Sequence, residues 1–175
     1  YSVWANQGVR AEPISVKYVI DREDNIVEEN APKTKRVLEK NVAYQMIYVM
    51  KGVVDGGTGS RIRSLGFRRP AAGKTGTTND STDAWFIGFV PDLTTGVWVG
   101  FDDTKSTRRT GAEAALPIWA DFMKSVVEGP EKDFPVPGGV MFRSVGTVIG
   151  SGSKEAFLPG TSPKSSSSGE DDFGL

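Results

Sequence analysis

The stretch of this sequence that says most about possible chemistry is Gly73–Thr78, which reads Gly-Lys-Thr-Gly-Thr-Thr and carries an ammonium and three hydroxyls. On a strand, Lys74 and Gly76 point to one face while Thr75 and Thr77 point to the other. All of these polar groups can therefore serve one groove only at the edge of a sheet, where strand twist helps. Glycine beside such an edge lets a ligand's backbone approach closely, and the edge itself can pair with an extended peptide.

Gly-Lys-Thr has two competing interpretations. A nucleotide-binding P-loop needs a further glycine five residues earlier and a helix afterwards. Here Arg68 occupies that position and strand-like residues follow, which argues against a nucleotide site. The other interpretation is the Lys-Thr-Gly box of the serine acyltransferases that bind penicillin. Because a tripeptide alone is a weak signal, the flanking sequence has to decide.

The composition excludes several other kinds of site. The chain has 175 residues, 21 basic and 22 acidic side chains, and no histidine or cysteine. It therefore cannot build a Ser-His-Asp triad, a Cys-His pair or a Cys/His zinc site, and we expect no metal and no organic cofactor. A net charge of -1 argues against a general nucleic-acid binder. No run of about 18 apolar residues predicts a membrane span, and no signal peptide is recognisable.

Before the motif, the spacing of apolar residues predicts a hairpin and then a helix. Residues 13–29 alternate as a strand does, turn at Asp24-Asn25 and return, which predicts a small hairpin. Residues 37–54 have helical spacing and end at Gly56-Gly57. The predicted apolar stripe of this helix is Leu38, Val42, Met46, Ile47, Met50, Val53 and Val54. Between Gly56 and Gly73 we expect a positively charged surface loop, carrying Arg61, Arg63, Arg68 and Arg69.

From the motif onward, three short apolar runs predict a three-stranded antiparallel meander over residues 71–78, 84–90 and 96–101. Both faces of these strands are apolar, so we expect helices to cover the sheet on both sides. A helix predicted over residues 117–127 suits one face; its stripe is Ile118, Trp119, Phe122, Met123, Val126 and Val127. The tryptophans at positions 85, 98 and 119 are interpreted as packing residues.

These elements predict an α/β (α+β) fold, an antiparallel sheet covered by helices. One more strand is predicted over residues 140–149, so that residues 1–149 form the folded piece. Residues 150–175 are rich in serine and glycine, and we expect them to form a low-complexity, disordered tail.

Longer stretches around the motif closely resemble the C-terminal half of the transpeptidase domain in class A penicillin-binding proteins. The nearest stretches are Gly73–Asp80, Asp83–Asp92 and Gly96–Asp103, and the resemblance continues through Tyr1–Gly8, Gly52–Gly59, Pro117–Met123, Phe134–Pro137 and Phe157–Thr161. It covers nearly the whole chain in the expected order. It also implies a β-lactamase/transpeptidase-like fold that is incomplete without the upstream half of the domain.

The resemblance implies a bifunctional cell-wall enzyme. A glycosyltransferase domain would polymerise glycan strands, and the transpeptidase domain would cross-link stem peptides through a serine that attacks D-Ala-D-Ala. β-Lactams would acylate the same serine, so stem peptides and β-lactams are the implied partners. The implied location is the bacterial cytoplasmic membrane, with this part on the periplasmic side and the anchor in an N-terminal segment that the chain lacks.

Position for position, the resemblance assigns substrate binding to Lys74, Thr75, Gly76 and Thr77, and catalytic roles to Lys74 and Thr77. Lys74 would direct positive charge toward the nucleophile. The two threonine hydroxyls would hold the terminal carboxylate of the substrate, and the backbone N–H of Thr77 would be one oxyanion-hole donor.

The sequence departs from the family pattern at the nucleophile. No Ser-x-Asn occurs, and the one Ser-x-x-Lys is Ser151–Lys154, after the motif and in a Gly/Ser-rich segment. A serine nucleophile needs a fixed position beside its base, so Ser151 is a poor candidate. We therefore expect the nucleophile on residues upstream of this chain, and the chain alone to be inactive.

Two alternatives remain open at this stage. A serine β-lactamase also uses a Lys-Thr-Gly strand, but it would need a deacylating carboxylate upstream. The chain could instead be a non-catalytic interaction fragment, which reaction of the complete domain with labelled penicillin would exclude.

Overall fold

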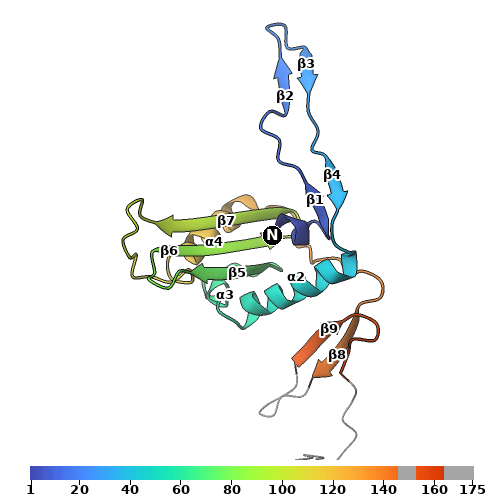
Figure 1. Ribbon diagram of the computed structural model, residues 1–175, viewed down its shortest axis with the longest axis vertical. Helices are drawn as coiled ribbons and strands as arrows, with labels where there is room; N and C mark the ends of the chain where they lie inside the picture. The colour runs from blue at the N-terminus through green and yellow to red at the C-terminus, as the bar shows by residue number, and fades with distance from the viewer. Residues whose placement is uncertain (146–152, 164–175) are drawn as a thin grey trace, which may run out of the picture.

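The computed structural model describes residues 1–145 and 153–163 (Figure 1). Its helices are α1 (Ser2–Ala5), α2 (Lys40–Asp55), α3 (Arg61–Ser64) and α4 (Ala115–Val126). Its strands are β1 (Val9–Ala11), β2 (Tyr18–Ile20), β3 (Ile26–Glu29), β4 (Thr34–Arg36), β5 (Ala72–Thr77), β6 (Asp83–Val90), β7 (Leu93–Gly100), β8 (Met141–Val145) and β9 (Ser153–Phe157). The mixed helix and antiparallel-sheet architecture is as predicted.

The central sheet has three strands in the order β5-β6-β7, and both of its pairings are antiparallel. The predicted meander is therefore confirmed. The largest difference is that β7 begins at Leu93 rather than at residue 96, because Pro91-Asp92 alone form the turn after β6; the other strand ends differ by at most one residue. Strand β5 lies at one edge of the sheet, with Lys74 opposite Ile87 and Gly76 opposite Trp85.

Helix α4 covers one face of the sheet, because its apolar side packs on β6 and β7. Trp119 is fully buried there, and its indole N–H donates to the carbonyls of Gly88 at 3.2 Å and Thr95 at 3.1 Å. The ring also meets Phe86 edge to face, at 5.2 Å between centroids. The predicted stripe of this helix is wrong at Ile118, Phe122 and Val126, which are exposed, so the buried side is narrower than expected.

Helix α2 lies alongside β5, on the side away from β6 (Figure 1). Tyr44, Ile47 and Met50 pack in one cluster with Ala72 and Phe89 of the sheet. Val42 and Met46 belonged to the predicted stripe, yet each is 40% exposed. The helix was thus predicted correctly, but the side that it buries is rotated about the helix axis from the predicted stripe.

The second face of the sheet is open at one pair of tryptophans. Trp85 and Trp98 lie directly opposite each other on β6 and β7, 6.3 Å apart between ring centroids, and are 42% and 44% exposed. The expectation that helices cover both faces therefore holds only in part for the described residues: α2 buries Ala72 and Phe89 on this face, but Trp85 and Trp98 stay exposed. Trp119 packs as predicted, whereas these two tryptophans present an apolar surface.

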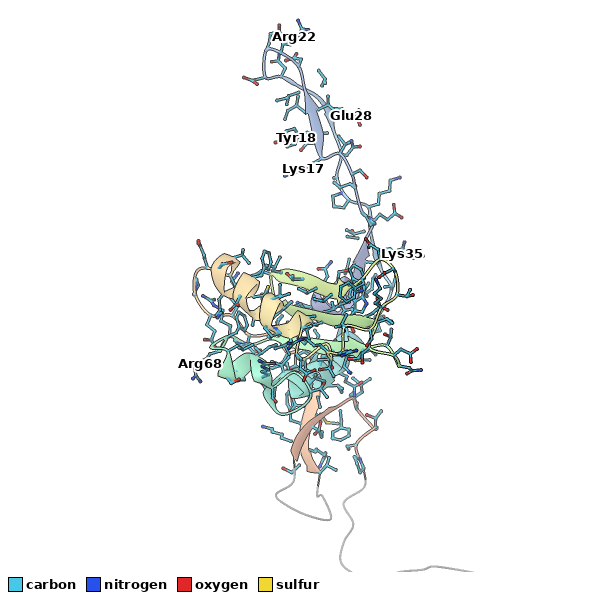
Figure 2. All side chains as sticks on the ribbon, turned by 90° about the vertical axis from the view of Figure 1, so that its left-hand side faces the viewer. Lys17, Tyr18, Arg22, Glu28, Lys35 and Arg68 are labelled. Atoms are coloured by element: carbon cyan, nitrogen blue, oxygen red, sulfur yellow. The ribbon has the colours of Figure 1, made fainter. Side chains whose placement is uncertain are left out.

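The predicted hairpin is part of a long arm that projects from the sheet (Figures 1 and 2). β2 and β3 pair antiparallel, and the Asp21 carboxylate accepts the backbone N–H groups of Glu23 and Asn25 at 2.9 Å to fix the turn. Strand β2 begins only at Tyr18, so the expected start at residue 13 is wrong. A second ladder, between β1 and β4, joins the arm to the body and was not predicted.

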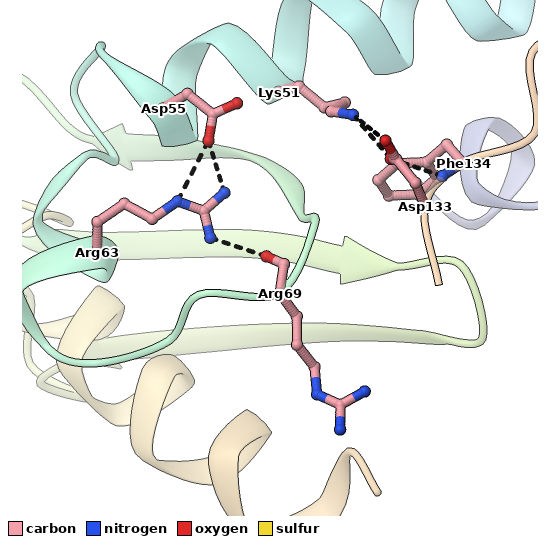
Figure 3. A network of polar contacts seen from close by, with 6 residues as sticks. All are labelled: Lys51, Asp55, Arg63, Arg69, Asp133 and Phe134. Atoms are coloured by element: carbon pink, nitrogen blue, oxygen red, sulfur yellow. Dashed lines mark hydrogen bonds and ion pairs between the residues drawn. The ribbon is translucent and has the colours of Figure 1, made fainter. Parts of the chain in front are cut away.

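The segment between Gly56 and Gly73 is more ordered than the predicted loop. It contains α3 and buries Ile62 and Phe67. Arg63 binds Asp55 at 2.6 Å and the carbonyl of Arg69 at 2.8 Å (Figure 3). The Arg69 guanidinium in turn donates to the carbonyls of Gly129 and Pro130. These two arginines therefore fasten the segment, and they are not a free positive surface.

The predicted strand after α4 is confirmed over β8, while residues 146–149 lie outside the described residues. We expected residues 150–175 to form a disordered tail, but Ser153–Phe157 form β9 and pair with β8. This hairpin packs on α2, where Gln45 donates to the carbonyl of Ala156 at 3.2 Å and the Phe142 ring meets Tyr44 edge to face and Tyr48 at a tilt. The packing of Phe142 and Ala156 on α2, rather than overall composition, decides the structure here.

The packing of α4 predicts that Trp119→Ala lowers the free energy of unfolding by about 3–5 kcal/mol, since it empties a large buried site. Phe122→Ala on the exposed side of the same helix is the matched control, with an expected change below about 1 kcal/mol. Urea denaturation of a polypeptide that contains the whole domain measures both. Equal effects of the two substitutions would contradict the described packing.

The contact between Lys51 and Asp133 predicts a stability that depends on pH. Burial raises the pKa of Asp133, but the hydrogen bonds from the Lys51 ammonium and the Phe134 N–H outweigh it and hold that pKa below its ordinary value of 3.8 (Figure 3). A carboxyl with a lowered folded pKa stabilises the fold above its unfolded pKa, and loses that contribution as the pH falls through the folded pKa.

Asp133→Asn should therefore remove a stabilisation of less than about 1 kcal/mol at pH 7, because the pair is partly exposed, and should flatten the acid limb of the stability curve. Asp24→Asn, at an exposed turn position of positive φ that Asn also tolerates, is the control. Urea denaturation at pH 2 to 7 measures the difference; an unchanged acid limb in Asp133→Asn would refute this role.

Candidate functional site

The backbone of β5 divides its residues into two sets. The N–H of Thr78 donates to the carbonyl of Asp83 at 3.2 Å. Hydrogen-bonded pairs alternate in an antiparallel ladder, so Lys74 and Gly76 direct their backbone groups to β6. Thr75 and Thr77 consequently direct their N–H and C=O groups away from β6, toward the outer side of the edge strand.

The Lys74 side chain reaches this outer side by folding around the edge. Its ammonium donates to the carbonyl of Thr75 at 2.9 Å and lies 3.4 Å from the Thr75 hydroxyl oxygen. The alternation of side chains along a strand places Lys74 and Thr75 on opposite faces of the sheet. Because the Lys74 side chain bends around the edge, its ammonium nevertheless lies beside the Thr75 hydroxyl. In residues 1–145 and 153–163, no carboxylate forms an ion pair with Lys74, so its charge is available to a ligand.

The Thr75 hydroxyl has a second neighbour. Its oxygen lies 2.9 Å from the hydroxyl oxygen of Thr58, which is located in the turn that follows α2. Sequence reasoning did not single out Thr58. Its local signal, a threonine between glycines at positions 57 and 59, is typical of a helix end and says nothing of a partner on another strand.

The Thr77 hydroxyl has a different neighbour, the segment that leads into α4. The backbone N–H of Gly111 donates to its oxygen at 3.0 Å. Gly111 lies so close to the sheet that an added Cβ would be 2.2 Å from the carbonyl oxygen of Trp85 and 2.6 Å from that of Gly76. Only glycine fits there, and it too escaped sequence reasoning because the close approach depends on the tertiary fold.

The segment around Gly111 has its own anchors. Thr107 donates through its hydroxyl to the carbonyl of Ser81 at 2.7 Å. The N–H and hydroxyl of Thr110 both donate to Glu113, at 2.8 and 3.0 Å, and together with the charges of Arg109 and Arg61 they lower the pKa of that carboxyl. Two cationic side chains thus lie near Glu113, close to the end of β5.

The predicted site residues therefore come together along one edge. Lys74, Thr75 and Thr77 contribute an ammonium and two hydroxyls, and Gly76 lies between the threonines with no side chain to obstruct them. Among the described residues, no cluster of acidic side chains could hold a metal ion. Ser151, the serine of the late Ser-x-x-Lys, lies outside the described residues. Arg68 points into solvent (Figure 2), as expected for a residue of a surface loop.

Comparison with solved structures identifies the class of protein. The crystal structure of penicillin-binding protein 1A from Haemophilus influenzae covers 93% of this chain with a TM-score of 0.82 at 25% identity, and the chain covers 31% of that protein. The structure of the penicillin-binding protein PonA1 from Mycobacterium tuberculosis covers 77% with a TM-score of 0.66 at 25% identity, and the chain covers 39% of it. The fold is thus that of penicillin-binding proteins.

Sequence comparison gives the family. The family described as penicillin binding protein transpeptidase domain matches residues 1–124, and the chain belongs to this family. Penicillin-binding protein 1A of Aquifex aeolicus is 43% identical over 140 residues, which cover 78% of this chain and 19% of that protein. Penicillin-binding protein 1B of Vibrio cholerae is 36% identical over 141 residues, covering 80% and 18%. The resemblance to class A proteins is confirmed.

The chain spans about a fifth of the length of the curated relatives it matches. Within the described ranges, no helix combines the length and the apolar character needed to cross a membrane.

The close approach of Gly111 predicts that Gly111→Ala displaces the segment before α4 and breaks its hydrogen bond to Thr77. We expect a loss of about 1–3 kcal/mol in the free energy of unfolding, typical of overpacking, and faster amide hydrogen exchange in residues 107–114. Gly138→Ala is the control, because an added Cβ there meets nothing within 4 Å. Unchanged exchange in Gly111→Ala would show that the segment does not depend on this contact.

Proposed function

We propose that the outer side of β5 binds the D-Ala-D-Ala terminus of a peptidoglycan stem peptide and presents it to a serine on another part of the polypeptide. The observation that carries this proposal is the state of the two hydroxyls. Donors already approach both oxygens, Lys74 at Thr75 and the Gly111 N–H at Thr77. A threonine hydroxyl has one proton and two lone pairs. The proton of Thr77 is therefore left to be donated, and so is that of Thr75 when the neighbouring Thr58 hydroxyl donates to it.

Two neighbouring hydroxyl protons beside an ammonium suit a carboxylate. Hydrogen bonds to an ionised acceptor are shorter and roughly twice as strong as neutral ones. Thr75, Thr77 and Lys74 would thus hold the terminal carboxylate of the stem peptide, or the equivalent carboxylate of a β-lactam. Gly76 between them lets the peptide backbone lie close to the strand.

The backbone of Thr77 supports a second role. Its N–H points to the outer side of β5, where it would donate to the oxyanion that develops on the substrate carbonyl. A single donor of this kind typically contributes about 2.7–4 kcal/mol to lowering the barrier. The N–H of the attacking serine would be the other donor, so the hole would be complete only when both parts of the domain are together.

The proposed reaction is a serine acyl transfer. The serine oxygen attacks the carbonyl carbon of the penultimate D-Ala, its proton passes to a base, and the C–N bond to the last D-Ala breaks as that nitrogen takes up a proton. The amine of a neighbouring stem peptide then attacks the acyl ester and releases the serine. A β-lactam would follow the first step only, because its opened ring stays attached and blocks the second amine.

The serine and the remaining boxes would come from the upstream part of the domain. The exposed Trp85 and Trp98 offer an apolar face on which that part can pack, since a patch of this kind marks an interaction surface. In this proposal the whole protein also carries a glycosyltransferase domain and is anchored in the cytoplasmic membrane, with β5 on the periplasmic side. The chain alone would then be inactive.

Labelled penicillin tests the proposal on the polypeptide that contains the complete domain. Lys74→Ala should slow acylation by at least about 100-fold, since it removes charge at the reacting groups. Lys35→Ala, an exposed lysine on the arm (Figure 2), is the control and should react normally.

Mass spectrometry of the acylated protein should place the modified serine outside the 175 residues of this chain. Acylation of Ser151 or of any other serine within the chain would contradict the proposed source of the nucleophile. Acylation of Lys74→Ala at the normal rate would contradict the proposed role of β5.

A further inference from the structure

We propose that Thr58 is a positioning residue that turns the hydroxyl proton of Thr75 toward the substrate carboxylate. This inference rests on the proposed function of β5 and names a further residue of that site. Its starting point is the contact of 2.9 Å between the two hydroxyl oxygens, in which either atom could be the donor.

Thr58 is held firmly although its side chain is exposed. The N–H of Gly57 donates to the carbonyls of Gly52 and Val53 at 3.0 and 3.2 Å, and the N–H of Gly59 donates to Val53 at 2.9 Å. An added Cβ at Gly57 would lie 2.9 Å from the Cα of Val53. The turn therefore wraps tightly around the end of α2, and α2 packs on β5. Thr58 is thereby fixed relative to Thr75.

The direction of this hydrogen bond decides what Thr75 can do. If Thr75 donated to Thr58, its only proton would be used and none would remain for a carboxylate. Lys74, at 3.4 Å, can only donate. When Thr58 also donates, both lone pairs of Thr75 are occupied and its proton must point elsewhere, toward the outer side of β5. A bound carboxylate favours this arrangement, because a chain of hydrogen bonds that ends on a charge strengthens along its length.

Thr58 thus acts through Thr75 and need not touch the ligand. Replacing it with valine keeps the shape of the side chain but removes the donor. The Thr75 hydroxyl would then be free to rotate, and part of its preorganisation toward the carboxylate would be lost.

The test uses the polypeptide with the complete transpeptidase domain, carrying Thr58→Val, Thr58→Ser, Thr75→Val or both valines. Acylation rates are measured with labelled penicillin and with the same compound esterified at its carboxylate. Thr58→Val should slow acylation by free penicillin about tenfold, the effect of one hydrogen bond to a charged system, and should change the rate with the ester less than about twofold. Thr58→Ser retains the donor and should restore the rate.

Thr58→Val combined with Thr75→Val should react no more slowly than Thr75→Val alone, because residues that act through one another are not additive. Thr34→Val, on an exposed strand where the described residues offer its side chain no hydrogen bond, is the matched control. Melting temperatures of all variants identify any that fail to fold.

Three outcomes would overturn the inference: an unchanged rate in Thr58→Val, an equal loss with penicillin and its ester, or additive effects in the double variant. The second would mean that Thr58 only stabilises the structure, and the third that it contacts the ligand independently. Lys74→Ala in the same experiment separates this inference from the proposed function. If Lys74→Ala slows acylation and Thr58→Val does not, the role of Thr58 alone is refuted.

Discussion

The site depends on one constraint, the number of protons and lone pairs that a hydroxyl possesses. A threonine on a strand edge can offer its proton to a ligand only if the fold does not use that proton first. At Thr77 the fold supplies a backbone N–H from Gly111, and at Thr75 it supplies the Lys74 ammonium and the Thr58 hydroxyl. The groups around β5 are therefore placed so that the hydroxyl protons of Thr75 and Thr77 can be donated to a ligand.

Two of the helices matter to this site, because the segment next to each of them brings one of those groups to β5. The end of α2 carries the turn with Thr58, and the segment before α4 carries Gly111. Helix α4 is fixed to the other two strands through the buried Trp119. Packing at a distance from the motif thus sets the positions of groups within 3 Å of its hydroxyls.

The sequence was sufficient for the features that depend on local spacing. The meander, α2 and α4 follow from periodicity and turn residues, and the motif marks the edge strand that carries Lys74, Thr75, Gly76 and Thr77, whose roles in substrate binding and catalysis stay a prediction. It was insufficient for contacts between distant residues: Thr58 and Gly111 carry no local sign that they face the motif. Trp85 and Trp98 lie on strands as apolar as core strands, but burial depends on what covers them, and the described part of this chain leaves these two side chains exposed.

Predictions from amino-acid composition were wrong for two segments, and each error has a physical reason. The arginines at positions 63 and 69 were predicted to form a solvated basic loop, yet carbonyl groups and Asp55 nearby in space bind them. Residues 150–175 were predicted to be disordered, but Ser153–Phe157 form β9, and Phe142 of β8 and Ala156 of β9 pack their hairpin on α2. In both cases a few specific contacts outweigh the average character of the segment.

The most direct test of this account is a crystal structure of the complete domain acylated by penicillin. The account predicts that the carboxylate of the bound drug lies within about 2.5–3.2 Å of the hydroxyl oxygens of both Thr75 and Thr77, with Thr58 still adjacent to Thr75. A carboxylate bound away from β5, with both hydroxyls turned from it, would contradict the account.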